Sequence, residues 1–206
     1  MQQVLSNFIV IEGLDGSGTT TQLKKVVELF DKQTISTHAT FEPTSSPLGS
    51  LVRQVLRHEV VTTPLALALL FAADRDDHLH HPITGITQRL ANGEIVISDR
   101  YFFSSLAYQS VDCGFEKVLS LNQFPYPEYI FFIDTPIDDC LYRIDERKEN
   151  KEIFEHKEFL TKVKHNYDKI FSDLPHDVHF FVIDGTKSKE EITQTISSIL
   201  ENEKLL

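Results

Sequence analysis

A glycine-rich stretch, GLDGSGTTTQ at residues 13–22, separates two segments that predict different secondary structures. Before it, FIVIE (8–12) is a short, continuously apolar run, which is typical of a parallel strand buried on both faces. After it, apolar residues recur at helical spacing from Leu23 to Phe30. The chain must therefore place a glycine turn between a strand and a helix N-terminus. Successive backbone N–H groups of such a turn face one point and bind phosphate well.

The rest of the chain alternates between strand and helix patterns. Further buried strands are expected at 94–99, 129–134 and 179–184, with a weaker one at 34–41. Helices are expected at 47–58, 64–80, 104–120, 136–147, 155–171 and 189–201. Ser188 followed by Glu191 predicts a capping box for the last helix. The alternation predicts an α/β fold with a mostly parallel sheet, whose ligands bind at the carboxyl ends of the strands.

Composition and charge exclude several classes of protein. The 206 residues are 41% hydrophobic and 25% charged, as in one ordinary globular domain. A formal net charge of -11 argues against a general nucleic-acid or membrane-surface binder. Cys113 and Cys140 lack metal-ligand spacing and are expected to be free thiols in a reducing compartment. With no basic leader and no long apolar run at the start, we expect a cytoplasmic single domain over residues 1–206.

The glycine stretch matches most of the phosphate-loop motif G-x-x-x-x-G-K-[ST]. The loop at 13–20 would bind ATP through Gly13, Leu14, Asp15, Gly16, Ser17, Gly18, Thr19 and Thr20. Thr20 has the hydroxyl that the motif uses to hold Mg²⁺, but Thr19 stands where the motif has its lysine. Nucleotide binding can rest on backbone amides, whereas phosphoryl transfer needs nearby cations. Candidate replacements in the charged stretch 143–158 are Arg143, Arg147, Lys148 and Lys151. That stretch is interpreted either as a segment that closes over the site or as a solvated helix.

Several stretches, in order, resemble the thymidylate kinases within the nucleoside-monophosphate kinase group. FIVIEGLDGSGTTTQL resembles the family's first strand, loop and helix, and FEP (41–43) resembles its R-E-P segment. LLFAADR (69–75) resembles its F-x-A-x-R helix, and the end of 90–109 resembles D-R-Y-x-x-S-x-x-A-Y-Q. PEYIFFIDTP and YRIDERKENKEIFE resemble later blocks. The resemblance spans nearly the whole chain. It implies a P-loop NTPase-type three-layer sandwich with a short lid at about 143–155, and a homodimer.

The resemblance implies transfer of the ATP γ-phosphoryl group to dTMP, giving dTDP, with Mg²⁺ as cofactor. Phe71 would stack on thymine, Arg75 would hydrogen-bond the base edge, and Arg100 would clamp the acceptor phosphate. The implied acceptor-binding residues are Asp15, Glu42, Pro43, Phe71, Arg75, Arg100, Ser104, Ser105, Tyr108 and Gln109. Thr20 and Asp99 would hold Mg²⁺. The implied catalytic residues are Asp99, Arg100, Arg143 and Arg147.

Two departures from the family pattern leave alternatives open. Thr19 replaces the loop lysine, and Phe41 replaces the arginine of R-E-P. Either other cations compensate for them, or the chain is a catalytically impaired nucleotide-binding homologue. A kinase for another deoxynucleotide or a deoxynucleoside is a further alternative. DDHLHH (76–81) is interpreted as solvated surface rather than a metal site, because no second ligand cluster accompanies it.

Overall fold

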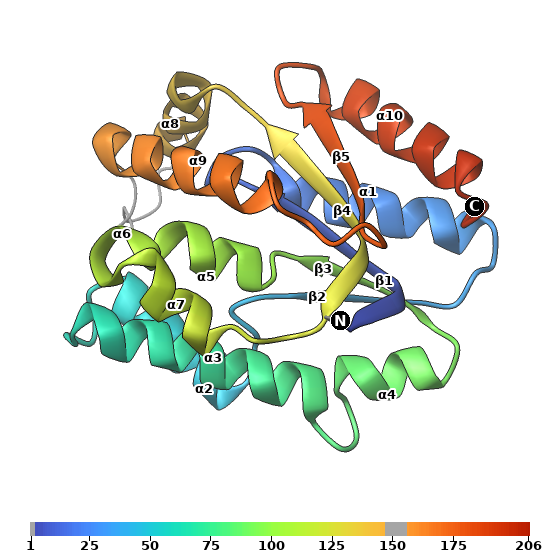
Figure 1. Ribbon diagram of the computed structural model, residues 1–206. Helices are drawn as coiled ribbons and strands as arrows, with labels where there is room; N and C mark the ends of the chain where they lie inside the picture. The colour runs from blue at the N-terminus through green and yellow to red at the C-terminus, as the bar shows by residue number, and fades with distance from the viewer. Residues whose placement is uncertain (1–2, 147–155) are drawn as a thin grey trace.

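A single five-stranded sheet organises the molecule (Figure 1). The computed structural model describes residues 3–146 and 156–206. Its strands are β1 (Val4–Gly13), β2 (Thr37–Phe41), β3 (Ile95–Asp99), β4 (Tyr126–Asp134) and β5 (His179–Asp184). Their order is β2-β3-β1-β4-β5, and every pairing is parallel. The predicted α/β fold is therefore confirmed. Most of the predicted lid lies outside the described residues, together with Arg147, Lys148 and Lys151.

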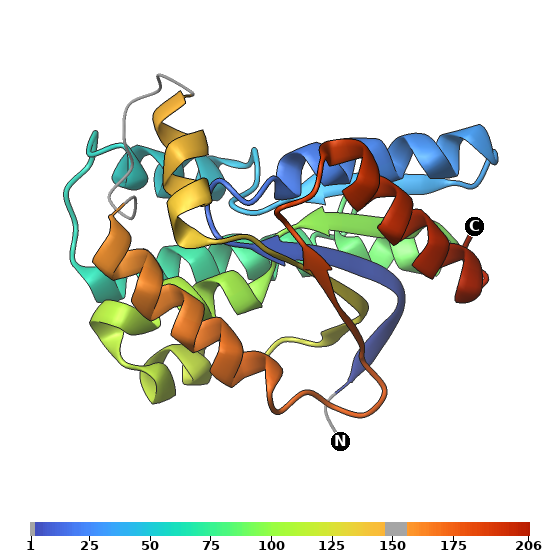
Figure 2. The same ribbon diagram turned by 90° about the horizontal axis from the view of Figure 1, so that it is seen from above.

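Helices cover both faces of the sheet and make three layers (Figure 2). One face packs against α1 (Thr19–Lys32) and α10 (Lys189–Asn202). On the side of the other face lie α2 (Pro47–Leu56), α3 (Pro64–His80), α4 (Ile86–Ala91), α5 (Phe102–Tyr108), α6 (Ser110–Cys113), α7 (Phe115–Leu121) and α9 (Lys157–Phe171). Between β4 and α9, α8 (Ile137–Glu146) lies beside the glycine turn, with Cys140 close to Gly16.

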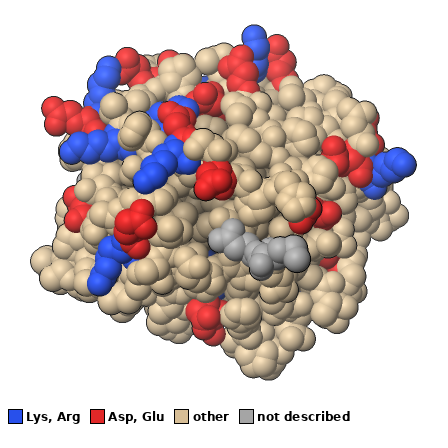
Figure 3. All heavy atoms as spheres, viewed as in Figure 1, with Lys and Arg blue, Asp and Glu red and all other residues tan. Residues whose placement is uncertain are grey.

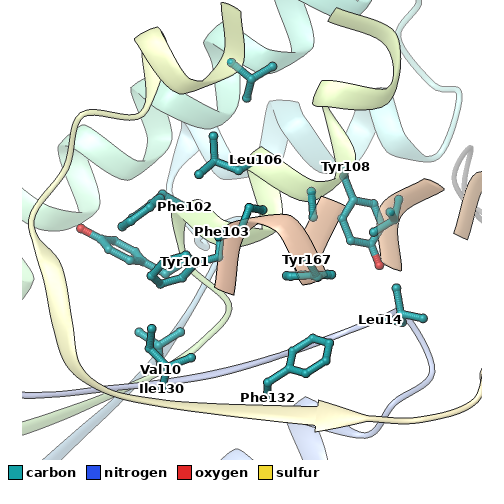
Figure 4. Packing of buried hydrophobic residues seen from close by; sticks show 14 of the residues in the cluster. Val10, Leu14, Tyr101, Phe102, Phe103, Leu106, Tyr108, Ile130, Phe132 and Tyr167 are labelled. Atoms are coloured by element: carbon teal, nitrogen blue, oxygen red, sulfur yellow. The ribbon is translucent and has the colours of Figure 1, made fainter. Parts of the chain in front are cut away.

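The apolar run in β1 supplies both layers of the core. Phe8 and Val10 belong to one hydrophobic cluster, whereas Ile9 and Ile11 belong to the other, and all four are fully buried. Alternate side chains of a strand point to opposite faces, so a strand with helices on both sides must be apolar throughout. Figure 4 shows the first cluster, in which aromatic rings from α5 and α9 lie over β1 and β4. This packing fixes the end of β1, and therefore the start of the glycine turn.

The structure corrects several element boundaries. The predicted helix at 104–120 is wrong as one helix, because the chain there forms α5, α6 and α7. Gly114, between α6 and α7, has φ +81°, a backbone conformation that interrupts a helix. The helix α4 was not predicted, since six residues are too short to show a period. The capping box of Ser188 with Glu191 is confirmed.

The surface carries mixed charge. On the face shown in Figure 3, lysine and arginine side chains lie among aspartate and glutamate side chains. The whole chain has 31 acidic residues against 20 lysines and arginines. Within residues 3–146 and 156–206, no helix has both the length and the apolar character that crossing a membrane requires.

Candidate active site

A cavity of about 580 Å³ opens at the carboxyl-terminal edge of the sheet, a size typical of small-molecule sites. The glycine turn, the start of α1, the end of β2, and α3 and α5 contribute to its wall. Every residue that the sequence predicts to bind the acceptor lines it: Asp15, Glu42, Pro43, Phe71, Arg75, Arg100, Ser104, Ser105, Tyr108 and Gln109. Both predicted metal-binding residues, Thr20 and Asp99, line it as well. The fold thus brings together side chains from separate parts of the sequence.

The glycine turn has a backbone that only glycine adopts easily. Gly16 and Gly18 have φ values of +84° and +102°. A Cβ on Gly16 would lie 2.4 Å from the carbonyl oxygen of Cys140, so the close approach of α8 also excludes a side chain there. No described side chain caps α1 at Gly18, and the N–H groups of its first turn are left for a ligand. This arrangement favours an anion at the helix N-terminus.

Thr20 and Asp99 form an oxygen cluster where α1 begins and β3 ends. The Thr20 hydroxyl donates a hydrogen bond to Oδ2 of Asp99 at 2.5 Å. Oδ1 of Asp99 is buried and has no hydrogen-bond partner among the described residues. Mg²⁺ prefers oxygen ligands and usually takes one or two carboxylates, with phosphates and waters in its other positions. The donor set therefore fits Mg²⁺ bound together with a nucleotide.

Arg100 is held in an unusual backbone conformation at the end of β3. Its φ is +71°, which is uncommon for a residue other than glycine and recurs at functional sites. The guanidinium donates to Oδ1 of Asp15 at 2.6 Å and to the Ser104 hydroxyl at 2.9 Å. Burial alone would lower the pKa of Arg100, but the carboxylate of Asp15 raises it well above its ordinary value. A permanently charged fork is thus fixed between the glycine turn and α5, on the cavity wall.

Glu12 anchors the segment that carries Arg100. It is fully buried in β1, immediately before the glycine turn. Its Oε1 accepts from the backbone N–H of Tyr101 at 2.8 Å. Its Oε2 accepts from the hydroxyls of Ser104 at 2.7 Å and Tyr167 at 2.9 Å. Burial raises the pKa of Glu12 to about 7, against the opposing effect of the Arg100 charge. The carboxyl group therefore ties the arginine-bearing turn to the central strand.

Arg75 is buried at the α3 wall of the cavity and is already hydrogen-bonded within the protein. Its guanidinium donates to Oε2 of Glu42 at 2.8 Å, to Oδ1 of Asn122 at 2.5 Å and to the Ser105 hydroxyl at 3.1 Å. Nδ1 of His78 lies 3.0 Å from the other oxygen of Glu42. Glu42 thus joins the two α3 side chains in one network. The position of Arg75 is set before any ligand binds.

The interpretation of residues 76–81 as solvated surface is wrong for His78. Only 9% of its side chain is exposed, and its Nε2 lies 2.6 Å from the hydroxyl of Thr40 in β2. His80, two residues later, is exposed. Residues 78 and 75 are three apart on α3 and share a face, so burial of one favours burial of the other. We interpreted the three histidines as one group, although their positions around the helix could have predicted that they differ in burial.

A family model described as thymidylate kinase matches residues 11–196. The chain belongs to the thymidylate kinase family. A protein of Treponema pallidum assigned as a thymidylate kinase is 39% identical over 202 residues, which covers 97% of this chain and 95% of that protein. Proteins of Pyrococcus horikoshii and Methanocaldococcus jannaschii with the same assignment are each 37% identical, and cover 96% and 95% of this chain and 97% and 96% of their own lengths. The resemblance inferred from the motifs is confirmed.

Thymidylate kinases transfer a phosphoryl group from ATP to dTMP. Both departures from the family motifs lie at the site. Thr19 is the first residue of α1, and its side chain is buried where the motif has a lysine. Phe41 lines the cavity and is 46% exposed, so an apolar ring takes the place of the motif's arginine. The chain therefore lacks the two cations that the family motifs have at these positions.

Arg143 of α8 is held against the glycine turn rather than on the cavity wall. Its Nη1 donates to the carbonyl oxygens of Gly16 at 3.4 Å and Ser17 at 3.3 Å. Its Nη2 donates to the carbonyl oxygen of Gly185 at 3.0 Å. In this arrangement the guanidinium supports the turn. The predicted catalytic roles of Arg143 and Arg147 stay predictions, and Arg147 lies outside the described residues.

The residues that sequence reasoning missed are mostly partners of predicted ones. Glu12 was visible as a single carboxylate in an otherwise apolar strand, a pattern that indicates a buried and partnered acid. Asn122 and Tyr167 gave no local signal, because they reach the site from distant helices. Asp74 holds the segment after β2, accepting from the backbone N–H of Thr44 at 2.7 Å. Tertiary partners of this kind cannot be read from spacing along one element.

Proposed function

We propose that the protein is a dTMP kinase, which transfers the γ-phosphoryl group of ATP to dTMP and yields dTDP and ADP on the route to dTTP. The observation that carries the proposal is one cavity that joins the glycine turn to Arg100, Phe71 and Arg75, in a chain of the thymidylate kinase family. The glycine turn would hold the ATP phosphates, and the remainder of the cavity would hold the acceptor nucleotide.

The acceptor would lie with its base between α3 and α5. Phe71 offers an aromatic face to thymine, and the fixed network of Arg75 offers a positioned donor to the base edge. Ser105 and Gln109 line the same wall. Tyr108 accepts a hydrogen bond from the backbone N–H of Asp15 at 2.9 Å, and its bulk would exclude a ribose 2′-hydroxyl. A deoxynucleotide is thus the acceptor that this wall favours.

The reaction needs positioning and charge rather than a strong base. The acceptor oxygen belongs to a phosphate and is already anionic, so the protein has to hold two anions in line and exclude water. Arg100 would neutralise the acceptor phosphate, and Asp15 and Ser104 would keep its guanidinium in place. Thr20 and Asp99 would hold Mg²⁺, which supplies charge neutralisation on the ATP phosphates when it is bound.

A coupled assay of ADP release tests the proposal. With ATP, Mg²⁺ and dTMP we expect steady turnover, and with dUMP about tenfold lower kcat/KM, because a single methyl group contributes about that much discrimination. dCMP and thymidine should be poor acceptors. Preferred turnover with thymidine or dCMP would give the chain a different acceptor. Protein that binds ATP and dTMP but releases no ADP would be a binding homologue, for which the missing cations at Thr19 and Phe41 are the structural argument.

We infer that the chain forms a homodimer through the outer side of α3. Val61, Leu65 and Leu69 are exposed by 94%, 38% and 48%, and their spacing of four places the two leucines on one helix face. An apolar stripe of this kind is typical of an interaction surface. Sedimentation velocity is expected to give twice the chain mass of 23.6 kDa. A monomer at micromolar concentration would contradict the inference.

We also propose a cytoplasmic location, which two free cysteines support.

A further inference from the structure

Four basic residues line the cavity, and within the part of the chain that the structure describes one of them has no hydrogen-bond or ion-pair partner. Arg53 donates to the carbonyl oxygen of Pro43 at 2.7 Å, Arg75 is bound by Glu42, and Arg100 is bound by Asp15. The fourth is Lys24 of α1, which is exposed. It makes no hydrogen bond and no ion pair with any described residue. Among the described residues that line the cavity, Lys24 is therefore the cation whose charge no protein partner balances.

Helix geometry favours an orientation of Lys24 toward the Thr20 end of the cavity. It follows Thr20 by four residues, so the two side chains share a face of α1, about one turn or 5.4 Å apart. Helical side chains tilt toward the helix N-terminus, which brings the ammonium group toward the Thr20 and Asp99 oxygens. Ala39 and Phe41 of β2 also line the cavity. Apolar side chains of this kind would offer a surface for the lysine stem while its charged end stays in the cavity.

The charge is needed because the motif's own cations are absent. Phosphoryl transfer is accelerated mainly by positive charge placed against the transferring group. Thr19 and Phe41 supply none, and the guanidinium of Arg143 is hydrogen-bonded to carbonyl oxygens of the glycine turn. We propose that Lys24 is a catalytic residue, and that its ammonium group contacts the transferring phosphoryl group in place of the loop lysine. This inference rests on the proposed kinase function.

The next residue of the same helix provides a matched control. Lys25 pairs with Glu190 of α10 at 3.2 Å, outside the cavity. Lys24→Met and Lys25→Met remove the same charge from the same helix, and the two substitutions differ in which surface loses it. Because Lys24 is exposed and unpaired among the described residues, Lys24→Met should leave thermal stability unchanged.

Steady-state kinetics with ATP and dTMP test the proposal. Lys24→Met is expected to lower kcat about 100-fold, as the loss of one transition-state contact does, with little change in the KM for dTMP. Lys25→Met should keep the kcat of the wild type. The double variant with Thr19→Lys and Lys24→Met should have a kcat about tenfold higher than that of Lys24→Met alone, since it returns a cation to the phosphates. A purely structural role for Lys24 would not be rescued in this way.

The outcomes separate this inference from the proposed function. Wild-type protein without turnover would reject the kinase function itself. Wild-type turnover together with an unchanged kcat in Lys24→Met would overturn the role of Lys24 alone. A loss in Lys24→Met that Thr19→Lys does not restore, or an equal loss in Lys25→Met, would also overturn it. Isothermal titration with dTMP gives an independent readout, and its Kd should be the same for Lys24→Met and the wild type.

Discussion

Replacement of Arg100 by alanine is expected to lower kcat/KM for dTMP by a factor on the order of 10³, while ATP binding stays close to that of the wild type. The guanidinium is fixed by Asp15 and Ser104 at the cavity wall, on the acceptor side of the glycine turn. If Arg100 binds the acceptor phosphate as proposed, its removal would leave that phosphate without the bidentate partner that matches its shape. In the proposed site, ATP would bind chiefly to backbone amides of the turn, and alanine leaves these in place.

Two further variants make the Arg100 experiment specific. Arg57→Ala removes a guanidinium whose partner is Glu59 at 2.8 Å, in a pair about half exposed, and should leave kcat/KM unchanged. Arg100→Lys keeps the charge but not the fork, and should recover part of the lost activity. Steady-state kinetics with dTMP and titration with an ATP analogue provide the readouts. Wild-type turnover in Arg100→Ala would show that the acceptor phosphate binds elsewhere.

The architecture was predictable because its signals are local. The apolar residues of FIVIE had to be buried on both faces, and the structure places residues 8–11 alternately in two hydrophobic clusters. The glycine turn was predictable for the same reason. Gly16 and Gly18 have positive φ values, which glycine adopts more easily than other residues. The helix at 104–120 failed because its apolar pattern continues through Gly114, where the backbone turns. Periodicity identifies buried residues more reliably than it identifies the ends of elements.

The residues that line the cavity were predictable, but the contacts between them were not. Phe71 and Arg75 share a helix face, and spacing alone places both on the cavity wall. Spacing does not show that Asn122 and Glu42 hold the Arg75 guanidinium, because these partners come from other elements. It also could not separate Lys24 from Lys25, which differ only in the element that each faces.

The second large effect is expected for Glu12→Gln and depends on pH. The pKa of Glu12 is about 7 in the folded protein, against a model-peptide value of 4.5, because burial disfavours the charged carboxylate. Between these pH values the folded protein binds a proton that the unfolded chain has lost, so its stability falls as pH rises toward 7. This difference between the two pKa values corresponds to about 3 kcal/mol of unfolding free energy. That contribution is fully present below pH 4.5 and is lost above pH 7.

Glutamine resembles the protonated form of Glu12, and it does not titrate. It can accept from the Tyr101 N–H and donate toward the Ser104 and Tyr167 hydroxyls, so the anchor of the arginine-bearing turn persists. Urea denaturation should show that the wild type loses about 2.5 kcal/mol of unfolding free energy relative to Glu12→Gln between pH 5 and pH 8.

Glu28→Gln, at an exposed position of α1, should have the same unfolding free energy as the wild type at every pH. A constant difference between the wild type and Glu12→Gln would mean that the buried carboxyl group does not titrate in this range. In that case the charge of Arg100, which lowers the pKa of Glu12, would be strong enough to keep the carboxylate ionised.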